Sequence, residues 1–256
     1  MVSNEQRRRR LAREKFERQE QRREAARRKV RRRNVVIASA LAVALAAGAA
    51  VAAAGALGGD DSTDARNTPQ STTPSPKPEP SMAVDRKAKY TMAVKTDQGD
   101  ITVSMDAAKT PHTVNSFKHL ADQGYFDRTT CHRLTTKNIH VLQCGDPEGT
   151  GMGNPGYTLP DENLGGLGKA GEDGKVTFPA GTVAMANTSR PDSGGSQFFL
   201  VYKDSRLTPT FTPFGTMDAA GLEAVRKVGA AGVKGGGGDG APKKAVAVQK
   251  VSVQKD

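Results

Sequence analysis

The feature that most limits what this chain of 256 residues can fold into is its uncharged run Val35–Leu57. A helix rising about 1.5 Å per residue would extend roughly 34 Å over this run, enough to cross a hydrocarbon core of about 30 Å. We therefore expect residues 35–57 to be a transmembrane helix. A cleaved signal peptide and a buried helix are the alternatives. The long basic region before the run, and the length of the run itself, favour an uncleaved anchor.

The basic character of the chain is confined to its N-terminal tail. Residues 1–33 contain 15 Lys or Arg and five Glu, a net charge of +10, which leaves +1 of the overall +11 for the rest. Positive charge concentrates on the cytoplasmic side of a membrane helix. We therefore expect a single-pass cell-membrane protein with residues 1–34 in the cytoplasm and the remainder outside the cell.

The tail has a second expected consequence, attraction to anionic lipid at the membrane surface. Binding of RNA or of a cytoplasmic protein by the tail is the alternative, but no aromatic residues are interleaved with its arginines. The nearly neutral remainder of the chain offers no basic surface for nucleic acid, so we expect none to bind there.

Residues 58–88 have the composition of a tether. They contain five prolines, including those of the segment Thr73–Pro80, and few apolar residues. Such a segment cannot bury a core, so the composition predicts an extended, disordered linker.

From residue 89 onward the pattern changes to that of a folded domain, 89–256. Tyr90–Thr96 and Ile101–Met105 alternate apolar and polar residues on either side of a turn, which predicts a β-hairpin. Helical spacing follows Thr110-Pro111 up to Gly124, with the threonine as N-cap. Further expected elements are strands at 131–135, 139–143, 181–186 and 197–202, a helix at 219–228 and a closing strand at 245–253. This pattern favours a mainly β fold, a closed or nearly closed β-barrel capped by two helices, and of these we expect the closed antiparallel barrel.

The two cysteines, Cys131 and Cys144, lie on the two strands of one expected hairpin. If Arg133 lies opposite Gln143, the cysteines are diagonal neighbours within possible reach of a disulfide. A disulfide and two free thiols both remain open. We expect no metal site, because the four histidines do not combine with the cysteines in a usual zinc-ligand spacing.

Three segments, taken together, resemble the cyclophilin family. The first is Phe126–Leu134, with its His132-Arg133 pair. The second is Val141–Pro147, followed by Gly149-Thr150-Gly151. The third joins Val183–Asn187 to Gly195–Leu200. Their order and spacing match the family, and the resemblance extends over roughly residues 89–256.

The resemblance implies a peptidyl-prolyl cis/trans isomerase that acts on proline-containing polypeptides, as a monomer and without a cofactor. Arg133 would stabilise the twisted peptide bond, and Gln143 would position Arg133. Asn187 would hold the peptide beyond the bond, through its amide or its backbone groups. These three are the expected catalytic residues.

The same comparison implies the residues that bind substrate. Phe199 and Val141 would form an apolar pocket for the proline ring, and Ala186 and Gln197 would line the peptide groove. At Leu207 many relatives carry a tryptophan that helps to bind cyclosporin, so we expect low cyclosporin sensitivity.

One departure falls in the expected pocket. His140 stands where the family usually has a phenylalanine against the proline ring. Imidazole is smaller and more polar, so the packing of the ring would weaken by about 1 kcal/mol. Either Ile139 fills the gap, or the enzyme is slower, or binding depends on pH through His140.

Two functions therefore follow from the sequence. The first is an isomerase that assists the folding of secreted or cell-surface proteins. The second is a cyclophilin-like module or chaperone that binds proline-containing segments with weak or no turnover. Arg133, Gln143, Asn187 and Phe199 favour the first, and His140 favours the second. A third hypothesis is that the basic tail, residues 1–34, is the functional element and that the domain, residues 89–256, is its extracellular sensor.

Overall fold

The structure, a computed structural model, describes residues 77–256. Most of its strands belong to one sheet: β1 (Lys89–Thr96), β2 (Ile101–Asp106), β3 (Thr129–Thr130), β4 (Arg133–Thr135), β5 (Val141–Cys144), β7 (Thr182–Met185), β8 (Phe198–Val201), β10 (Pro213–Met217), β11 (Asp239–Gly240) and β12 (Ala247–Lys255). The other elements are a two-stranded ribbon of β6 (Val176–Phe178) and β9 (Ser205–Leu207), the helices α2 (Pro111–Asp122) and α3 (Ala219–Ala231), and a short 3₁₀ turn, η1 (Lys234–Gly236).

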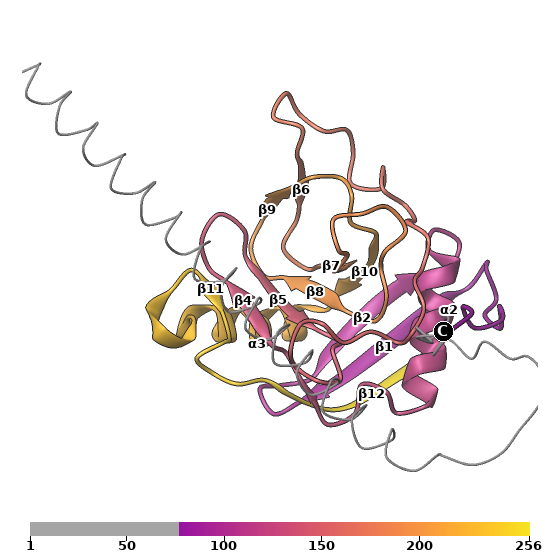
Figure 1. The fold of residues 1–256 in the computed structure, drawn as a ribbon, viewed down its shortest axis with the longest axis horizontal. Coiled ribbons are helices and arrows are strands. Elements are labelled where there is room, and N and C mark those ends of the chain that lie inside the picture. Colours follow the sequence, from indigo (N-terminus) through magenta and orange to yellow (C-terminus); the bar gives the residue numbers. More distant parts are fainter. Residues whose placement is uncertain (1–76) are drawn as a thin grey trace, which may run out of the picture. The chain divides into compact units, whose positions relative to one another are not determined.

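The ten-stranded sheet is antiparallel and strongly curled (Figure 1). Its order is β11-β4-β5-β8-β7-β10-β2-β1-β12-β3, so β11 and β3 are edges that do not pair with each other. The expected closed barrel is therefore wrong, and the sheet is an open, curled half-barrel. The two edge strands are only two residues long, too short to form the ladder that closure requires, and short edges also limit pairing with other chains.

The main core forms where the alternating strands face the first helix. Tyr90, Met92 and Val94 on β1 are buried, as the expected hairpin requires. On α2 the ring of Phe117 packs against three other phenylalanines, with ring centroids 4.8 to 5.5 Å apart: Phe126, Phe198 and Phe214. Aromatic pairs at these separations add to the stability that burial provides. The expected hairpin and both expected helices are confirmed.

The start of α2 is capped differently from the expectation. Thr110 occupies the N-cap position, but its side chain makes no capping hydrogen bond. Instead the Glu162 carboxylate accepts hydrogen bonds from the backbone N–H groups of His112 and Thr113, at 3.0 and 2.9 Å. A carboxylate satisfies these free donors and interacts favourably with the helix dipole. The cap thus comes from a loop about 50 residues away in the sequence.

Residues 77–88, expected to be the end of a disordered linker, make specific contacts with the domain. The Lys77 N–H donates to the carbonyl of Gly156 at 2.8 Å. Asn115 of α2 accepts from the Ala83 N–H at 2.8 Å and donates to two further carbonyls of the segment. Val84 is buried. The expectation of a disordered linker is therefore wrong for residues 77–88. The Asn115 side chain of α2 pairs with backbone groups of this segment, a contact that the composition of the segment does not reveal.

The expected transmembrane helix, residues 35–57, and the basic tail lie outside the described residues. Between Lys77 and Asp256 no helix combines the length and the apolar character needed to cross a membrane.

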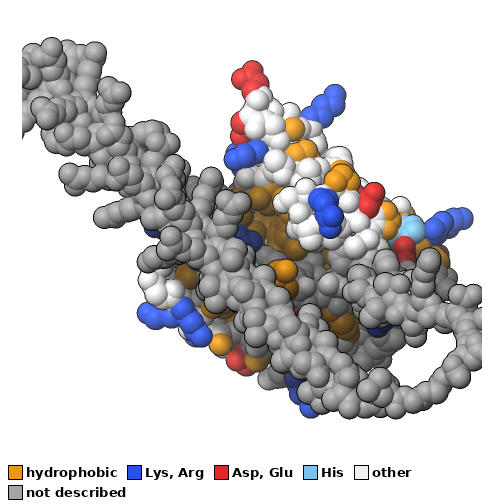
Figure 2. All heavy atoms as spheres, in the orientation of Figure 1, with side chains coloured by type: hydrophobic (Ala, Val, Ile, Leu, Met, Phe, Trp, Pro, Cys, Tyr) orange, Lys and Arg blue, Asp and Glu red, His pale blue; other side chains and the backbone are white. Residues whose placement is uncertain are grey.

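A second, smaller apolar cluster lies between the main sheet and the β6–β9 ribbon. Its buried members are Val141, Val176, Phe178, Ala184, Phe199 and Val201. Figure 2 shows hydrophobic side chains gathered in a hollow on the visible face, between loops that carry acidic and basic side chains. The sequence did not indicate the ribbon, whose strands are three residues each. The ribbon encloses the region in which the expected site residues meet.

Candidate active site

Three expected site residues lie in one row across neighbouring strands. Arg133 on β4 is directly opposite Gln143 on β5, which in turn is directly opposite Phe199 on β8. Directly opposite residues in antiparallel strands point to the same face of the sheet. The Arg133 Nη1 donates a hydrogen bond of 3.1 Å to the Gln143 Oε1. The register on which the pairing of the two cysteines was assumed, Arg133 opposite Gln143, is the one in the structure.

Beside this row is an apolar cavity of about 230 Å³. Arg133 and Gln143 contribute polar groups to its lining, and Val141, Phe199 and Leu207 contribute apolar walls. The described residues that complete the lining are Ile139, Ala186, Asn187, Ser189 and Phe211. The sequence assigned no role to Phe211, whose ring lies 5.4 Å from that of Phe199 with the two planes nearly perpendicular.

His140 is not among the residues that line this cavity, so the structure does not favour its expected place against a proline ring. Its ring packs instead against Tyr202, with centroids 5.7 Å apart. Ile139 and Val141, the neighbours of His140 in the chain, both line the cavity. Ile139 lines the cavity instead of His140. One of the alternatives drawn from the sequence was that Ile139 would fill the gap left by the missing phenylalanine.

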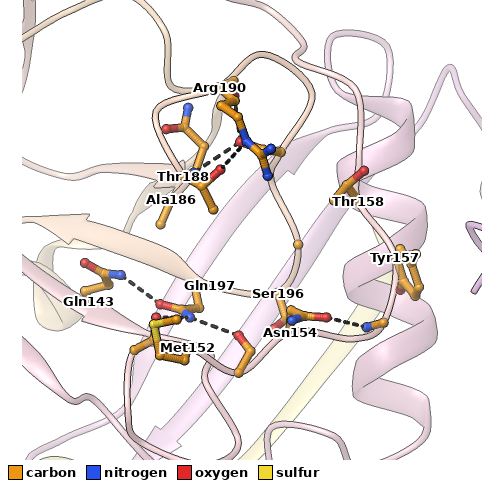
Figure 3. Close-up of a pocket in the computed structure, with 16 residues that line it drawn as sticks. Gln143, Met152, Asn154, Tyr157, Thr158, Ala186, Thr188, Arg190, Ser196 and Gln197 are labelled. Atoms are coloured by element: carbon orange, nitrogen blue, oxygen red, sulfur yellow. Dashed lines mark hydrogen bonds between the residues drawn. The ribbon is translucent and has the colours of Figure 1, made fainter. Parts of the chain in front are cut away.

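A bridge of two glutamines connects Gln143 to the next loop. The Gln143 Nε2 donates to the Gln197 Oε1 at 2.8 Å, and the Gln197 Nε2 donates to the carbonyls of Gly151 and Gly153 at 3.0 and 2.9 Å. Figure 3 shows the two side chains pointing toward each other. Because both ends of each amide are used, the orientation of Gln143 is fixed.

The glutamines also form part of a larger groove of about 510 Å³. Gln143, Ala186 and Asn187 line both this groove and the apolar cavity, so the two adjoin. Opposite the glutamines, Figure 3 places Arg190 and Thr188 on the loop that follows Asn187. An extended peptide that fills the cavity can therefore continue into the groove.

Asn187 braces its own loop. Its Nδ2 donates to the carbonyl of Thr210 at 2.7 Å, and its Oδ1 accepts from the Ser189 N–H at 3.0 Å. Both ends of the amide therefore have partners within the protein. Of the two expected contributions of Asn187 to peptide binding, these contacts favour the one made through its backbone groups.

Arg133 has a partner that the sequence did not indicate. Its Nε and Nη2 donate to the two carboxylate oxygens of Asp239 at 2.8 and 2.7 Å. This hydrogen-bonded pair raises the pKa of Arg133 and lowers the pKa of Asp239, so both groups are charged at neutral pH. No signal in the sequence marks Asp239, which follows a run of four glycines.

Cys131 and Cys144 form a disulfide in the structure. Of the two open alternatives, the structure therefore has the cross-linked one. Cys131 lies two residues before Arg133, and Cys144 directly follows Gln143. The cross-link thus joins the two chain segments that carry the hydrogen-bonded Arg133–Gln143 pair.

His132 lies next to Arg133 in the chain with both ring nitrogens buried. Within the described part of the chain, neither nitrogen has a hydrogen-bond partner. Burial lowers the pKa of His132, the Asp146 carboxylate opposes this shift and the Arg133 charge adds to it. The imidazole is therefore held in its neutral form.

Comparison with known proteins agrees with this geometry. Residues 91–253 match the family model described as cyclophilin type peptidyl-prolyl cis-trans isomerase/CLD. The chain belongs to this family. The match covers more than half of the chain, including both helices and every site residue named above.

Several curated cyclophilin-type proteins are similar to this chain. A probable peptidyl-prolyl cis-trans isomerase B of Mycobacterium tuberculosis is 46% identical over 168 residues, which cover 64% of this chain and 54% of the relative. The protein of the same description from Mycobacterium leprae is 44% identical, over 64% of this chain and 57% of the relative. Peptidyl-prolyl cis-trans isomerase B of Bacillus subtilis is 38% identical over 46% of this chain and 75% of the relative. The match thus spans little more than half the length of the mycobacterial relatives.

The fold is also that of solved cyclophilins. A crystal structure of a Cryptosporidium parvum cyclophilin type peptidyl-prolyl cis-trans isomerase matches with a TM-score of 0.53. The match covers 66% of this chain and 99% of that one, at 22% sequence identity. At this identity the likeness concerns the fold alone.

Proposed function

We propose that this cyclophilin-type chain is an active peptidyl-prolyl cis/trans isomerase. The observation that carries the proposal is the position of Arg133, which is oriented by Gln143 at the edge of an apolar cavity. Family membership supports the same activity. The reaction needs no cofactor, because no covalent bond is formed or broken.

The proposed mechanism is selective stabilisation of the twisted peptide bond. Amide resonance imposes a barrier of about 18 to 20 kcal/mol on rotation about an X–Pro bond. As the bond twists, the lone pair localises on the prolyl nitrogen, which becomes a hydrogen-bond acceptor. Arg133 is always charged and donates to this nitrogen only in the twisted state, so its contact lowers the barrier.

The remaining site residues hold the two ends of the bond. Phe199 and Val141, with Leu207, form the pocket for the proline ring. Ala186 and Gln197 line the groove for the rest of the peptide, and the backbone of Asn187 binds it beyond the rotating bond. Anchoring one end while the other rotates is what an isomerase of this kind requires.

The cellular role rests on the N-terminal sequence. Residues 35–57 anchor the chain in the cell membrane with the isomerase domain outside, and the basic tail is attracted to anionic lipid on the cytoplasmic side. Its substrates are then secreted or cell-surface polypeptides, whose folding slow X–Pro isomerisation can limit. The domain acts as a monomer and binds no nucleic acid.

One observation favours the second candidate, a binding module or chaperone with weak turnover. Asp239 compensates the charge of Arg133 through two hydrogen bonds. A compensated guanidinium donates less strongly to a substrate than a free one. The position of His140 no longer supports this candidate, since its ring is outside the cavity.

A peptide isomerisation assay on the full chain in detergent separates the two functions. We expect Arg133→Ala to lower kcat/KM about a hundredfold, the scale on which removal of one well-placed donor acts. Arg206→Ala is the matched control, because Arg206 is also a strand arginine paired with an aspartate, Asp173. Equal isomerisation rates for the wild-type chain and Arg133→Ala would exclude the isomerase function and leave the binding module as the function of the domain.

A further inference from the structure

The contact between Asp239 and Arg133 has the geometry of a positioning interaction. The carboxylate takes the side of the guanidinium formed by Nε and Nη2, at 2.8 and 2.7 Å. Gln143 takes one hydrogen of Nη1, at 3.1 Å. Two hydrogen bonds in parallel fix the plane of a guanidinium, whereas a single one leaves it free to rotate.

Strand pairing brings Asp239 to this place. Asp239 on β11 lies directly opposite Thr135 on β4, so it is a diagonal neighbour of Arg133, two residues earlier on the same face. Long side chains reach across such diagonals. The backbone before Asp239 is also anchored, because the Thr136 N–H donates to the carbonyl of Gly238 at 2.9 Å.

The three hydrogen bonds leave donors for a substrate. A guanidinium carries five N–H groups, and the bonds to Asp239 and Gln143 use one each on Nε, Nη1 and Nη2. One hydrogen on Nη1 and one on Nη2 therefore remain. The Arg133 guanidinium lines the apolar cavity, so these two N–H groups are available at the cavity. Asp239 and Gln143 already hold the plane of the guanidinium.

We propose that Asp239 is a positioning residue of the isomerase site, which holds the Arg133 guanidinium in the orientation that meets the prolyl nitrogen of the substrate. This inference rests on the proposed isomerase function. Stability does not account for the contact. The side chains of Arg133 and Asp239 are 40% and 56% exposed, and exposed ion pairs contribute little to folding.

The test uses the full chain and a peptide isomerisation assay that separates kcat from KM. We expect Asp239→Ala to lower kcat about tenfold, with KM within about twofold of wild type, because a misoriented catalytic group slows the reaction without weakening binding. Asp239→Asn keeps one acceptor oxygen and should lose less. Thermal unfolding of each variant reports whether the fold is intact.

The matched control is Asp173→Ala. Asp173 pairs with Arg206 through Nε and Nη2, and both side chains are 50% exposed, but neither residue lines the cavity. This variant should keep the wild-type kcat. An Arg133→Lys background is the second control, because an ammonium has no plane to orient. There Asp239→Ala should have no further effect on kcat.

The outcomes distinguish this inference from the function on which it rests. If the wild-type chain is no faster than Arg133→Ala, the isomerase function and the role of Asp239 both fall. If the wild-type chain is active but Asp239→Ala has an equal or higher kcat, only the positioning role is wrong. The same conclusion follows if Asp239→Ala lowers kcat by the same factor in the wild-type chain and in the Arg133→Lys background.

Discussion

Gln143 and Gln197 share a hydrogen bond of 2.8 Å that links the strand beside Arg133 to the loop across the groove. Through this bond the backbone carbonyls of Gly151 and Gly153 fix the amide of Gln143, and Gln143 in turn fixes Arg133. These hydrogen bonds hold one side of the guanidinium, and the Asp239 carboxylate holds the other.

Replacing Gln143 by leucine should slow the reaction without abolishing binding. The substitution removes the acceptor for Nη1 and leaves Gln197 with an unpaired oxygen. We expect kcat to fall about tenfold, because a buried hydrogen bond is worth roughly 1 kcal/mol and misorientation of Arg133 adds to its loss. Gln249→Leu, on the exposed side of β12, is the control. Isomerisation rates at saturating peptide measure the effect, and an unchanged kcat for Gln143→Leu would contradict it.

Ile139 and His140 are neighbours in the chain, and of the two only Ile139 lines the cavity. Ile139→Ala removes an apolar wall of the cavity, so KM should rise about fivefold, equivalent to roughly 1 kcal/mol of apolar contact. His140→Ala should leave KM within about twofold of wild type, because the His140 ring packs on Tyr202 outside the cavity. Binding of a proline peptide, measured by calorimetry, provides an independent check. The reverse order of the two effects would show that His140 is the pocket residue.

The disulfide should stabilise the domain and the site together. Closing a loop of 13 residues contributes about 3 kcal/mol to the free energy of unfolding in the chain-entropy account. We expect Cys131→Ala combined with Cys144→Ala to lose about this amount in denaturant unfolding and to have a reduced kcat, since the link joins the segments that carry Arg133 and Gln143. A thiol titration of the denatured, unreduced wild-type chain should find no free thiol. Two free thiols would contradict the account.

His132, whose ring nitrogens are buried, should make stability depend on pH. The pKa of His132 is lowered in the folded state, so the unfolded chain binds a proton at higher pH than the folded one. The free energy of unfolding therefore falls as the pH drops below about 6.5, the pKa of the unfolded histidine. Burial and the positive charge of Lys203 also lower the pKa of His140, so this residue contributes to the pH dependence with the same sign.

Denaturant unfolding between about pH 8 and pH 5 measures this dependence. His132→Gln should flatten the curve, because glutamine does not titrate. An equally steep curve in His132→Gln would show that other groups are responsible.

The sequence predicted the parts of the site that depend on short-range pattern. The strand alternation and the two strands of the hairpin were recognisable, and the register assumed for them, Arg133 opposite Gln143, is the one in the structure. The same rule does not extend to Ile139 and His140, because both residues precede β5.

Other features depend on contacts between distant parts of the chain and could not be predicted. Asp239 meets Arg133 across 106 residues and follows a glycine run with no periodicity. Glu162 caps α2 from about 50 residues away. Edge strands of two residues, β3 and β11, are too short to show any pattern, so nothing indicated that the barrel is open.

The most direct test of the central claim is NMR exchange spectroscopy on a proline-containing peptide mixed with a small amount of the full chain. Uncatalysed exchange between cis and trans X–Pro takes tens of seconds or more and gives no exchange peaks on the NMR timescale. We predict cis–trans exchange peaks with the wild-type chain and their loss with Arg133→Ala, while chemical-shift changes show that the variant still binds. Absence of exchange peaks with the wild-type chain, despite binding, would contradict the account.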